Sequence, residues 1–323
     1  MLGTRVLGRT GIEVSEVSVG TWAMGSEWGL SDDEASVRAL HRALDLGCTL
    51  LDTAQAYGDH RSERLIARVF RERGSSVAVA TKLPPKTRRW APPPGTPIAE
   101  VYPPEYILEG ADLSLSHLGV DVIDVYQLHT WLEDWNETDE WFEAMDRLKR
   151  QGKIRAIGIS VRDGKPGEAN GSIVKGRVDT VQVVYNILFQ APRKELFPVA
   201  RAHNVGILAR VPLASGALTG KFRRDTVFPP GDWRAQAFAG DTLERLVAAV
   251  ERVKAIVGTE APLLTRALQF ILADPEVSTV ITGVRTVKQA EENLTALAGP
   301  ALTEAQLSAL RALELPRFPA SPE

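Results

Sequence analysis

The sequence contains very few residues that bind metals or form disulfides. Its 323 residues include one cysteine, Cys48, and five histidines. A single thiol can form neither an internal disulfide nor a zinc site built from several thiolates. The histidines form no H-E-x-x-H motif and no close pair, so a histidine-based zinc site is not indicated. We therefore expect no metal ion in this protein.

An excess of charge of one sign and a long apolar segment are also missing. Lys and Arg total 38 and Asp and Glu total 41, which gives a formal net charge of −3. That balance provides no positive field to attract nucleic acid or an anionic membrane. No run approaches the roughly 18 apolar residues of a membrane span, and the first residues lack the apolar core of a secretory signal. We expect a cytoplasmic protein with neither a nucleic-acid nor a membrane partner.

The hydrophobic residues, 44% of the chain, fall into strand-like and helix-like segments that alternate. This proportion is typical of a globular protein. Eight short runs read as strands, and most of them are rich in Val, Ile and Leu at both odd and even positions, as expected of strands that are buried on both faces. We predict these strands at residues 14–19, 49–53, 77–81, 122–127, 156–160, 180–185, 206–210 and 278–282.

Helical periodicity fills most of the segments between the strands. A capping box, Ser31 to Glu34, opens one helix that Gly47 closes. The alternation predicts a parallel α/β fold, for which an open doubly wound sheet and a closed (β/α)8 TIM barrel are both possible. Eight units without a break in composition favour the barrel, as one domain over residues 1–323. The other predicted helices are 62–73, 104–118, 139–150, 194–204, 243–257, 261–273, 287–297 and 304–313.

Segments outside the eight units add two further expectations. Residues 4–14 precede the first strand and contain the turn-like Arg9-Thr10-Gly11, which predicts an N-terminal β-hairpin covering the barrel floor. The helix at 304–313 is an extra C-terminal helix. Three long loops, 83–102, 129–138 and 214–241, each follow a strand and so belong to the C-terminal face of the barrel, where active sites lie.

Four residues with useful chemistry stand at or just beyond neighbouring strand ends. Asp52 ends the second predicted strand, with Tyr57 in the loop that follows. Lys82 ends the third strand and His129 ends the fourth. Each alone has an ordinary explanation, such as a turn, a packed ring or a solvated amine. Together they indicate a site, because neighbouring strand ends converge at one rim of a barrel.

The chemistry of these four residues is coherent. A free tyrosine has a pKa of about 10, which is too high for efficient proton transfer at neutral pH. A unit charge about 4 Å away, at an effective dielectric constant of about 20, contributes about 4 kcal/mol or roughly three pKa units. The Lys82 ammonium would lower the pKa of Tyr57, Asp52 would keep Lys82 charged, and His129 would donate a hydrogen bond to a substrate oxygen. The group suits proton donation to a carbonyl as hydride reaches its carbon.

A phosphate-binding segment follows the eighth predicted strand. No G-x-G-x-x-G motif follows the first strand, so a Rossmann dinucleotide site is not indicated. Gly283, Arg285 and Thr286 instead lead into a helix, and helix N-termini after strands seven and eight of barrels often bind phosphate. The Arg285 guanidinium suits a phosphate. The segment from Thr286 to Gln289 also reads as a capping box, which gives Gln289 a structural role as an alternative.

The motif order resembles that of a known family. Leu51-Asp52-Thr53-Ala54-Gln55-Ala56-Tyr57-Gly58 resembles the signature of the aldo-keto reductases, and the likeness extends from about Leu7 to Ala298. Ala80-Thr81-Lys82 and Asp124-Val125-Tyr126-Gln127-Leu128-His129 resemble that family's lysine and histidine strands. The resemblance implies a (β/α)8 barrel, NADPH as cofactor, and a catalytic tetrad of Asp52, Tyr57, Lys82 and His129. It makes Tyr57 the general acid.

The resemblance also implies a set of cofactor contacts. Ser160 and Gln182 would hold the nicotinamide carboxamide, and Arg285 the 2′-phosphate. Arg210 occupies the position of an aromatic residue that stacks on nicotinamide in the family, and Val161 replaces a usual asparagine. The full implied NADP(H) set is Gly20, Thr21, Trp22, Ser160, Gln182, Arg210, Pro212, Leu213, Ser215, Gly216, Leu218, Lys221, Gly283, Arg285, Gln289, Glu292 and Asn293.

Trp22 and Trp131 directly follow the first and fourth predicted strands, which predicts an apolar, aromatic-lined substrate pocket. We therefore expect an NADPH-dependent reductase of small-molecule aldehydes and ketones. An NADPH-binding regulatory or scaffold barrel with little turnover is the alternative. An unrelated barrel lyase or isomerase fits the fold but not the order of the motifs. The sequence indicates neither the natural substrate nor the oligomeric state.

Overall fold

Eight parallel strands close into a barrel in the computed structural model, which describes residues 2–25, 32–229, 231–316 and 318–319. Each strand pairs with the next one, and the last pairs with the first. The predicted (β/α)8 barrel is confirmed, and the open sheet is excluded. The strands are β3 (Val17–Gly20), β4 (Leu50–Asp52), β5 (Ala78–Leu83), β6 (Ile123–Leu128), β7 (Ile154–Ser160), β8 (Thr180–Val184), β9 (Gly206–Arg210) and β10 (Val277–Gly283).

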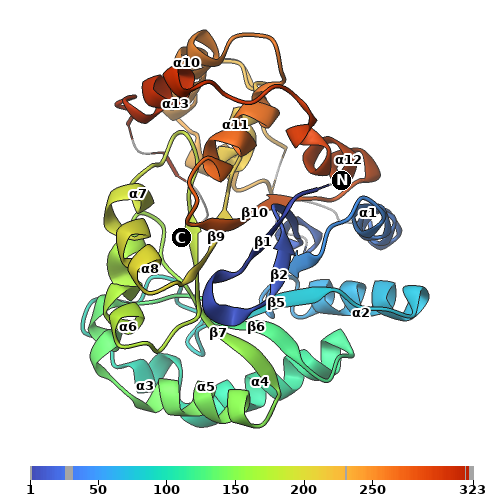
Figure 1. Cartoon of the computed structure of the whole chain (residues 1–323), viewed down its shortest axis with the longest axis vertical. Coiled ribbons are helices and arrows are strands. Elements are labelled where there is room, and N and C mark those ends of the chain that lie inside the picture. Colours follow the sequence, from blue (N-terminus) through green and yellow to red (C-terminus); the bar gives the residue numbers. More distant parts are fainter. Residues whose placement is uncertain (1, 26–31, 230, 317, 320–323) are drawn as a thin grey trace.

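Helices surround the barrel (Figure 1). None of the described helices is both long and apolar enough to cross a bilayer. The predicted extra C-terminal helix is present as the last of the series. The helices are α1 (Asp33–Asp45), α2 (Arg61–Arg73), α3 (Ile98–Val101), α4 (Pro104–Leu118), α5 (Glu140–Arg150), α6 (Asn170–Val174), α7 (Pro192–Glu195), α8 (Phe197–Ala202), α9 (Arg234–Ala237), α10 (Thr242–Val257), α11 (Leu263–Leu272), α12 (Val287–Leu294) and α13 (Glu304–Arg311).

The start of α1 differs from the predicted capping box. Asp32 is the N-cap, and its carboxylate accepts hydrogen bonds from the backbone N–H groups of Glu34 and Ala35. The predicted cap, Ser31, lies outside the described residues. An aspartate cap satisfies two free N–H groups and places a negative charge at the positive end of the helix dipole.

The first predicted strand, 14–19, divides into two elements. Its beginning belongs to β2 (Glu13–Ser15), which pairs antiparallel with β1 (Thr4–Val6) to form the predicted hairpin. Its end is β3, the first strand of the barrel. The sequence analysis did not separate the two elements, because Val14, Val17 and Val19 read as one β-like run across Glu16.

The hairpin closes the N-terminal end of the barrel (Figure 1). Leu7, Ile12 and Val14 are buried and pack onto side chains that fill the barrel interior. These interior side chains are Leu50, Ala80, Val125, Ala156, Leu208 and Ile281. Because these contacts seal the N-terminal end, the strands present their functional residues at the opposite end.

Two arginines fasten the hairpin to the strands that come late in the chain. Arg5 donates hydrogen bonds to the backbone carbonyls of Leu272, the last residue of α11, and Val277, the first residue of β10. Arg9 donates to the carbonyl of Val178 before β8 and pairs with Asp179. These bonds satisfy backbone carbonyls at the ends of three elements and tie the hairpin to them.

We predict that Leu7→Ala lowers the free energy of unfolding by about 2–5 kcal/mol, the cost of removing a fully buried leucine side chain. Leu7 is 0% exposed, whereas its neighbour Val6 is 52% exposed. The matched control Val6→Ala should change stability by no more than about 0.5 kcal/mol. Urea unfolding of both variants measures the difference. Equal effects would show that the hairpin does not depend on burial of Leu7.

Candidate active site

A cavity of about 1090 Å³ opens at the C-terminal end of the barrel. Asp52, Tyr57 and His129 line it, together with the loops that follow β9 and β10. Within the described residues, no group of three His, Cys, Asp or Glu side chains is placed to hold a metal ion. The position is the one expected of an active site in this fold.

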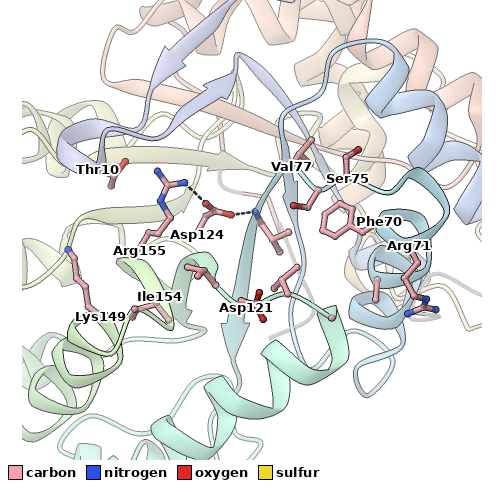
Figure 2. Close-up of a pocket in the computed structure, with 17 residues that line it drawn as sticks. Thr10, Phe70, Arg71, Ser75, Val77, Asp121, Asp124, Lys149, Ile154 and Arg155 are labelled. Atoms are coloured by element: carbon pink, nitrogen blue, oxygen red, sulfur yellow. Dashed lines mark hydrogen bonds and ion pairs between the residues drawn. The ribbon is translucent and has the colours of Figure 1, made fainter.

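A second hollow, of about 950 Å³, lies at the other end of the barrel, beside the starts of β5, β6 and β7 (Figure 2). Its most prominent polar group is Asp124, which accepts a hydrogen bond from the backbone N–H of Val79 and pairs with Arg155. None of the predicted site residues lines this hollow. Its polar contacts bind neighbouring strands to each other, so we assign the chemistry to the C-terminal cavity.

Lys82 forms the centre of the site. Its Nζ donates to Asp52 Oδ2 at 2.8 Å, to the carbonyl of Thr53 at 2.7 Å and to Tyr57 Oη at 3.4 Å. An ammonium has three protons, and all three have an acceptor here. Burial lowers the pKa of Lys82, and the adjacent Asp52 carboxylate opposes that shift. The short distances that the proton-transfer argument requires are therefore present.

Asp52 links three strands across the barrel mouth. Its Oδ2 binds Lys82 on β5, and its Oδ1 accepts a hydrogen bond from Gln182 Nε2 on β8 at 2.7 Å. Both Asp52 and Gln182 are almost fully buried. Gln182, which was predicted to contact the cofactor, lines the cavity and uses its amide nitrogen to hold Asp52 in place.

His129 lies between two aromatic rings. Its ring centroid is 5.7 Å from that of Tyr57 and 4.8 Å from that of Trp90, in edge-to-face arrangements. Burial lowers the pKa of His129 well below its ordinary value, and the positive charges of Lys82 and Arg210 lower it further. The imidazole is therefore neutral at neutral pH. A neutral imidazole donates a hydrogen bond but is a poor source of a proton.

A buried carboxylate that the sequence analysis missed supports the loop of Tyr57. Glu63, in the first turn of α2, is 0% exposed. It accepts hydrogen bonds from Thr81 and Ser114 at 2.6 and 2.8 Å, and His60 Nδ1 lies 2.6 Å from it. The contacts join the Tyr57 loop to β5 and α4. The available signal was a glutamate on the apolar side of an amphipathic helix.

Most of the predicted cofactor residues line the cavity. The exceptions are Thr21, which is buried and donates to the carbonyl of Asp52, and Leu218, which is 0% exposed. Lys221 and Arg285 are among the lining residues and supply positive charge. An added Cβ at Gly283 would meet no atom within 4 Å, so the backbone there is open to the cavity. A cavity of this volume with positive charge at Lys221 and Arg285 suits a dinucleotide with phosphate groups.

The loop after β9 has an unusual backbone. Val211, Ala214 and Ser215 have φ values of 55°, 47° and 56°, in the left-handed region. This conformation costs a residue with a Cβ about 1–2 kcal/mol, and such strain gathers at functional sites. This backbone could not be predicted, because none of the three residues is glycine or asparagine.

Arg210 and Val161, the two residues that depart from the family pattern, contact each other. Arg210 Nη2 donates to the carbonyl of Val161 at 3.0 Å and to Asp163 Oδ1 at 2.6 Å. The valine thus contributes its backbone oxygen where the family has an asparagine side chain. Asp163 balances the charge that an arginine brings to a position usually occupied by an aromatic ring.

The start of α12 is only partly the predicted capping box. Thr286 Oγ1 accepts from the backbone N–H of Gln289, but the Gln289 side chain accepts from the N–H of Arg285 rather than that of Thr286. Asn293 donates to the carbonyl of Gly283. Gln289 and Asn293 therefore brace the loop that presents Arg285 to the cavity.

The prediction that Trp131 lines the substrate pocket is wrong. Trp131 is fully buried, packs against Trp135 and Trp141, and donates its indole N–H to Asn136. Trp22 does line the cavity, as predicted, and Trp90 from the loop after β5 takes the place expected of Trp131.

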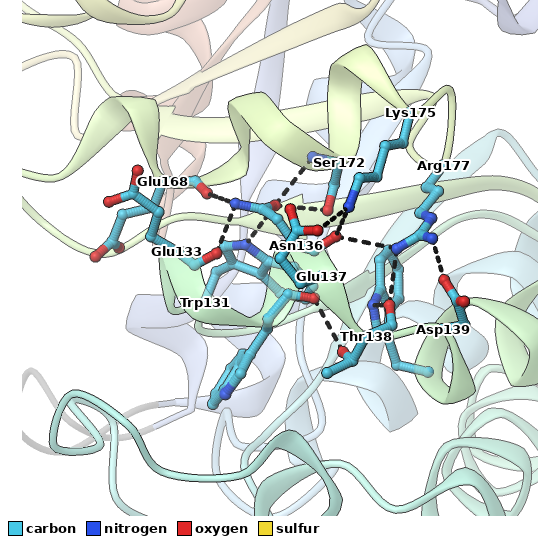
Figure 3. Close-up of polar contacts among 12 residues, drawn as sticks. Trp131, Glu133, Asn136, Glu137, Thr138, Asp139, Glu168, Ser172, Lys175 and Arg177 are labelled. Carbon is cyan, nitrogen blue, oxygen red and sulfur yellow. Dashed lines mark hydrogen bonds and ion pairs between the residues drawn. The ribbon is translucent and has the colours of Figure 1, made fainter.

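Asn136 anchors the loop that follows His129 (Figure 3). Its Oδ1 accepts from the N–H and hydroxyl of Ser172, and its Nδ2 donates to the carbonyls of Glu133 and Glu168. Arg177 donates to its backbone carbonyl. The side chain is almost fully buried and joins the loop to α6. The sequence analysis did not identify it, because its role depends on contacts with distant residues.

Known proteins are similar to this chain over most of its length. The family model of the Aldo/keto reductase family matches residues 16–315. The chain is 29% identical to an NADH-specific methylglyoxal reductase of Escherichia coli, over 90% of this chain and 92% of the relative. It is also 29% identical to the aldo-keto reductase yakc [NADP(+)] of Schizosaccharomyces pombe, over 88% and 84%. A glycerol dehydrogenase structure from Gluconobacter oxydans matches with a TM-score of 0.78 and 30% identity, over 95% and 94%.

We predict that His129→Asn reduces the dependence of stability on acid pH. Because the pKa of His129 is depressed in the folded state, the unfolded chain binds more protons below about pH 6.5, and folding stability falls as pH decreases. Removing one such group should reduce this slope by up to about 1.4 kcal/mol per pH unit. Denaturant unfolding between pH 8 and pH 5 measures it. An unchanged slope below pH 6.5 would contradict a neutral, buried imidazole.

Proposed function

Because the chain belongs to the aldo/keto reductase family, we propose that it is an NADPH-dependent oxidoreductase that reduces aldehydes and ketones to alcohols. The observation that carries the proposal is the bonding of Lys82. Its Nζ lies within hydrogen-bond distance of both Asp52 and Tyr57 at the mouth of the cavity. A phenol beside a buried ammonium suits proton donation to a carbonyl oxygen.

The part of the cavity that the predicted cofactor residues line fits a nicotinamide dinucleotide, which supplies the hydride when it is bound. Ser160, Gln182 and Arg210 would hold its nicotinamide end, near the tetrad. Lys221 and Arg285 would hold its phosphates, together with the N–H groups at the start of α12. All five of these residues line the cavity.

In this mechanism Tyr57 Oη donates its proton to the carbonyl oxygen of the substrate while the carbonyl carbon is reduced. The Lys82 ammonium stabilises the phenolate that remains. Asp52 and the Thr53 carbonyl hold Lys82 in position for this role. The substrate therefore gains its hydroxyl proton from a group whose charge is already compensated.

His129 has a different part. Because burial lowers its pKa well below the ordinary value, it is neutral and donates a hydrogen bond to the same carbonyl oxygen. Tyr57 is thus the better proton donor of the two. The Trp22 and Trp90 rings line the cavity beside them and restrict water, which strengthens the electrostatic contacts.

The preference for NADPH rests on the cations of the site. The relatives differ, since one is named as NADH-specific and another as using NADP(+). Arg285 lies beside the N-terminus of α12, where a planar guanidinium and free N–H groups suit a phosphate. We assign Arg285 to the 2′-phosphate that distinguishes NADPH from NADH.

A direct test is the oxidation of NADPH followed at 340 nm with a panel of simple aldehydes and ketones. Turnover with any of them supports the reductase. Tight binding of NADPH without turnover on the whole panel would instead favour the regulatory or scaffold barrel.

We expect Tyr57→Phe to reduce kcat by at least about 10²-fold, the lower range for loss of a general acid. The ring remains, so NADPH affinity should be nearly unchanged. The matched control is Tyr106→Phe, whose hydroxyl binds the carbonyl of Pro84 outside the cavity and whose loss should spare most of the turnover. Stopped-flow measurement of the hydride-transfer step is the assay. A Tyr57→Phe protein with most of its turnover would refute the assignment.

Replacing Arg285 with alanine should weaken NADPH binding about ten- to a hundredfold, because a charge-assisted bidentate contact contributes about 1.5–3 kcal/mol. NADH binding should change little, since NADH has no 2′-phosphate. The preference of the unmodified protein for NADPH should narrow as salt screens the phosphate. Fluorescence titrations with both cofactors measure this. Equal losses for NADPH and NADH would mean that Arg285 supports the loop only.

A further inference from the structure

One arginine in the cavity has no acid partner. Arg88, in the loop after β5, lines the cavity, and its guanidinium has no hydrogen-bond or ion-pair partner among the residues that the structure describes. Two other arginines of the cavity wall are neutralised, Arg162 by Glu168 and Arg210 by Asp163. Arg88 therefore leaves a positive charge available at the mouth of the site.

The topology separates Arg88 from the proposed cofactor phosphates. In the closed ring of eight strands, β5 lies four places from β9 and is therefore opposite to it. The loops after β9 and β10 carry Lys221 and Arg285, on the cofactor side. An anion that meets Arg88 consequently approaches from the substrate side.

The loop holds Arg88 in a fixed place. Its φ is 55°, a conformation that costs about 1–2 kcal/mol for a residue other than glycine, and its N–H donates to the carbonyl of Pro85. Strain of this kind gathers where a ligand is bound. Two residues on, the carbonyl of Trp90 accepts a hydrogen bond from Thr130 Oγ1 at 2.6 Å.

The loop after β6 holds the Arg88 loop in place through hydrogen bonds. Trp135 donates its indole N–H to the carbonyl of Thr96 at 2.7 Å, near the far end of the Arg88 loop. The segment that carries Thr130 and Trp135 is in turn fixed to α6 by Asn136 (Figure 3). The guanidinium thus projects from a loop whose backbone is bonded at both ends.

We propose that Arg88 binds an oxyanion of the substrate, a carboxylate or a phosphate ester, so that the preferred substrates are carbonyl compounds with a negative charge remote from the carbonyl. The proposal rests on the reductase function proposed above. A guanidinium fork pairs with two oxygens of such a group, and its charge also attracts anions to the cavity. Trp90, with its ring against His129, forms the apolar wall between the anion and the reacting carbonyl.

The test compares substrates that differ only in charge. 4-Carboxybenzaldehyde is paired with its methyl ester, and glyceraldehyde 3-phosphate with glyceraldehyde. We expect the charged member of at least one pair to have a kcat/KM at least about tenfold higher, through a lower KM. Arg88→Gln should remove this preference and leave the neutral substrates unchanged. The control Arg89→Gln removes the neighbouring arginine, which does not line the cavity, and should keep the preference.

The pair that shows an Arg88-dependent preference identifies the anion as a carboxylate or as a phosphate. Equal kcat/KM within both pairs, or a preference that survives Arg88→Gln, would overturn the proposal. Dissociation constants of the acid and the ester, from tryptophan fluorescence of the NADP⁺-bound protein, report the same preference without turnover. Failure of the reductase function is therefore distinguishable from failure of the anion site.

Discussion

The buried ion pair between Lys82 and Asp52 is the interaction on which the rest of the site depends. Each charge alone would cost several kcal/mol in the barrel interior, and removing one partner of such a pair costs about 3–5 kcal/mol. The pair forms because Asp52 ends β4 while Lys82 lies two residues beyond Ala80, its neighbour on β5. A shift of register in these strands would separate the charges. Correct closure of the barrel and assembly of the catalytic group are thus the same event.

Hydrogen bonds and burial already hold the polar groups around this ion pair in position. Gln182 orients Asp52, Glu63 fixes the strand and the loop that carry Lys82 and Tyr57, and burial keeps His129 neutral. Fixed dipoles and charges in a site with little water need no rearrangement when the carbonyl accepts a proton. In the proposed reductase, substrate preference belongs to the loops after the strands rather than to this inner group.

The sequence predicted best where a pattern is local. β9 and α4 agree with the prediction residue for residue, since a doubly buried strand and a helix that begins at Pro104 and is closed by Gly119 have clear signals. The convergence of Asp52, Tyr57, Lys82 and His129 could be predicted because strand ends in a parallel barrel converge. Glu63 left a signal that was missed, since it is a glutamate on the apolar side of an amphipathic helix. The direction of Trp131 and the roles of Trp90 and Asn136 could not be predicted, because they depend on contacts between loops that periodicity does not describe.

The arginines of the hairpin impose an order on folding. Arg5 binds the carbonyls of Leu272 and Val277, which lie 267 and 272 residues further along the chain. The hairpin therefore cannot complete these contacts until β10 is in place. Contacts this distant in sequence slow folding and prolong the life of intermediates with open strand edges. The feature that seals the finished barrel therefore also delays its completion.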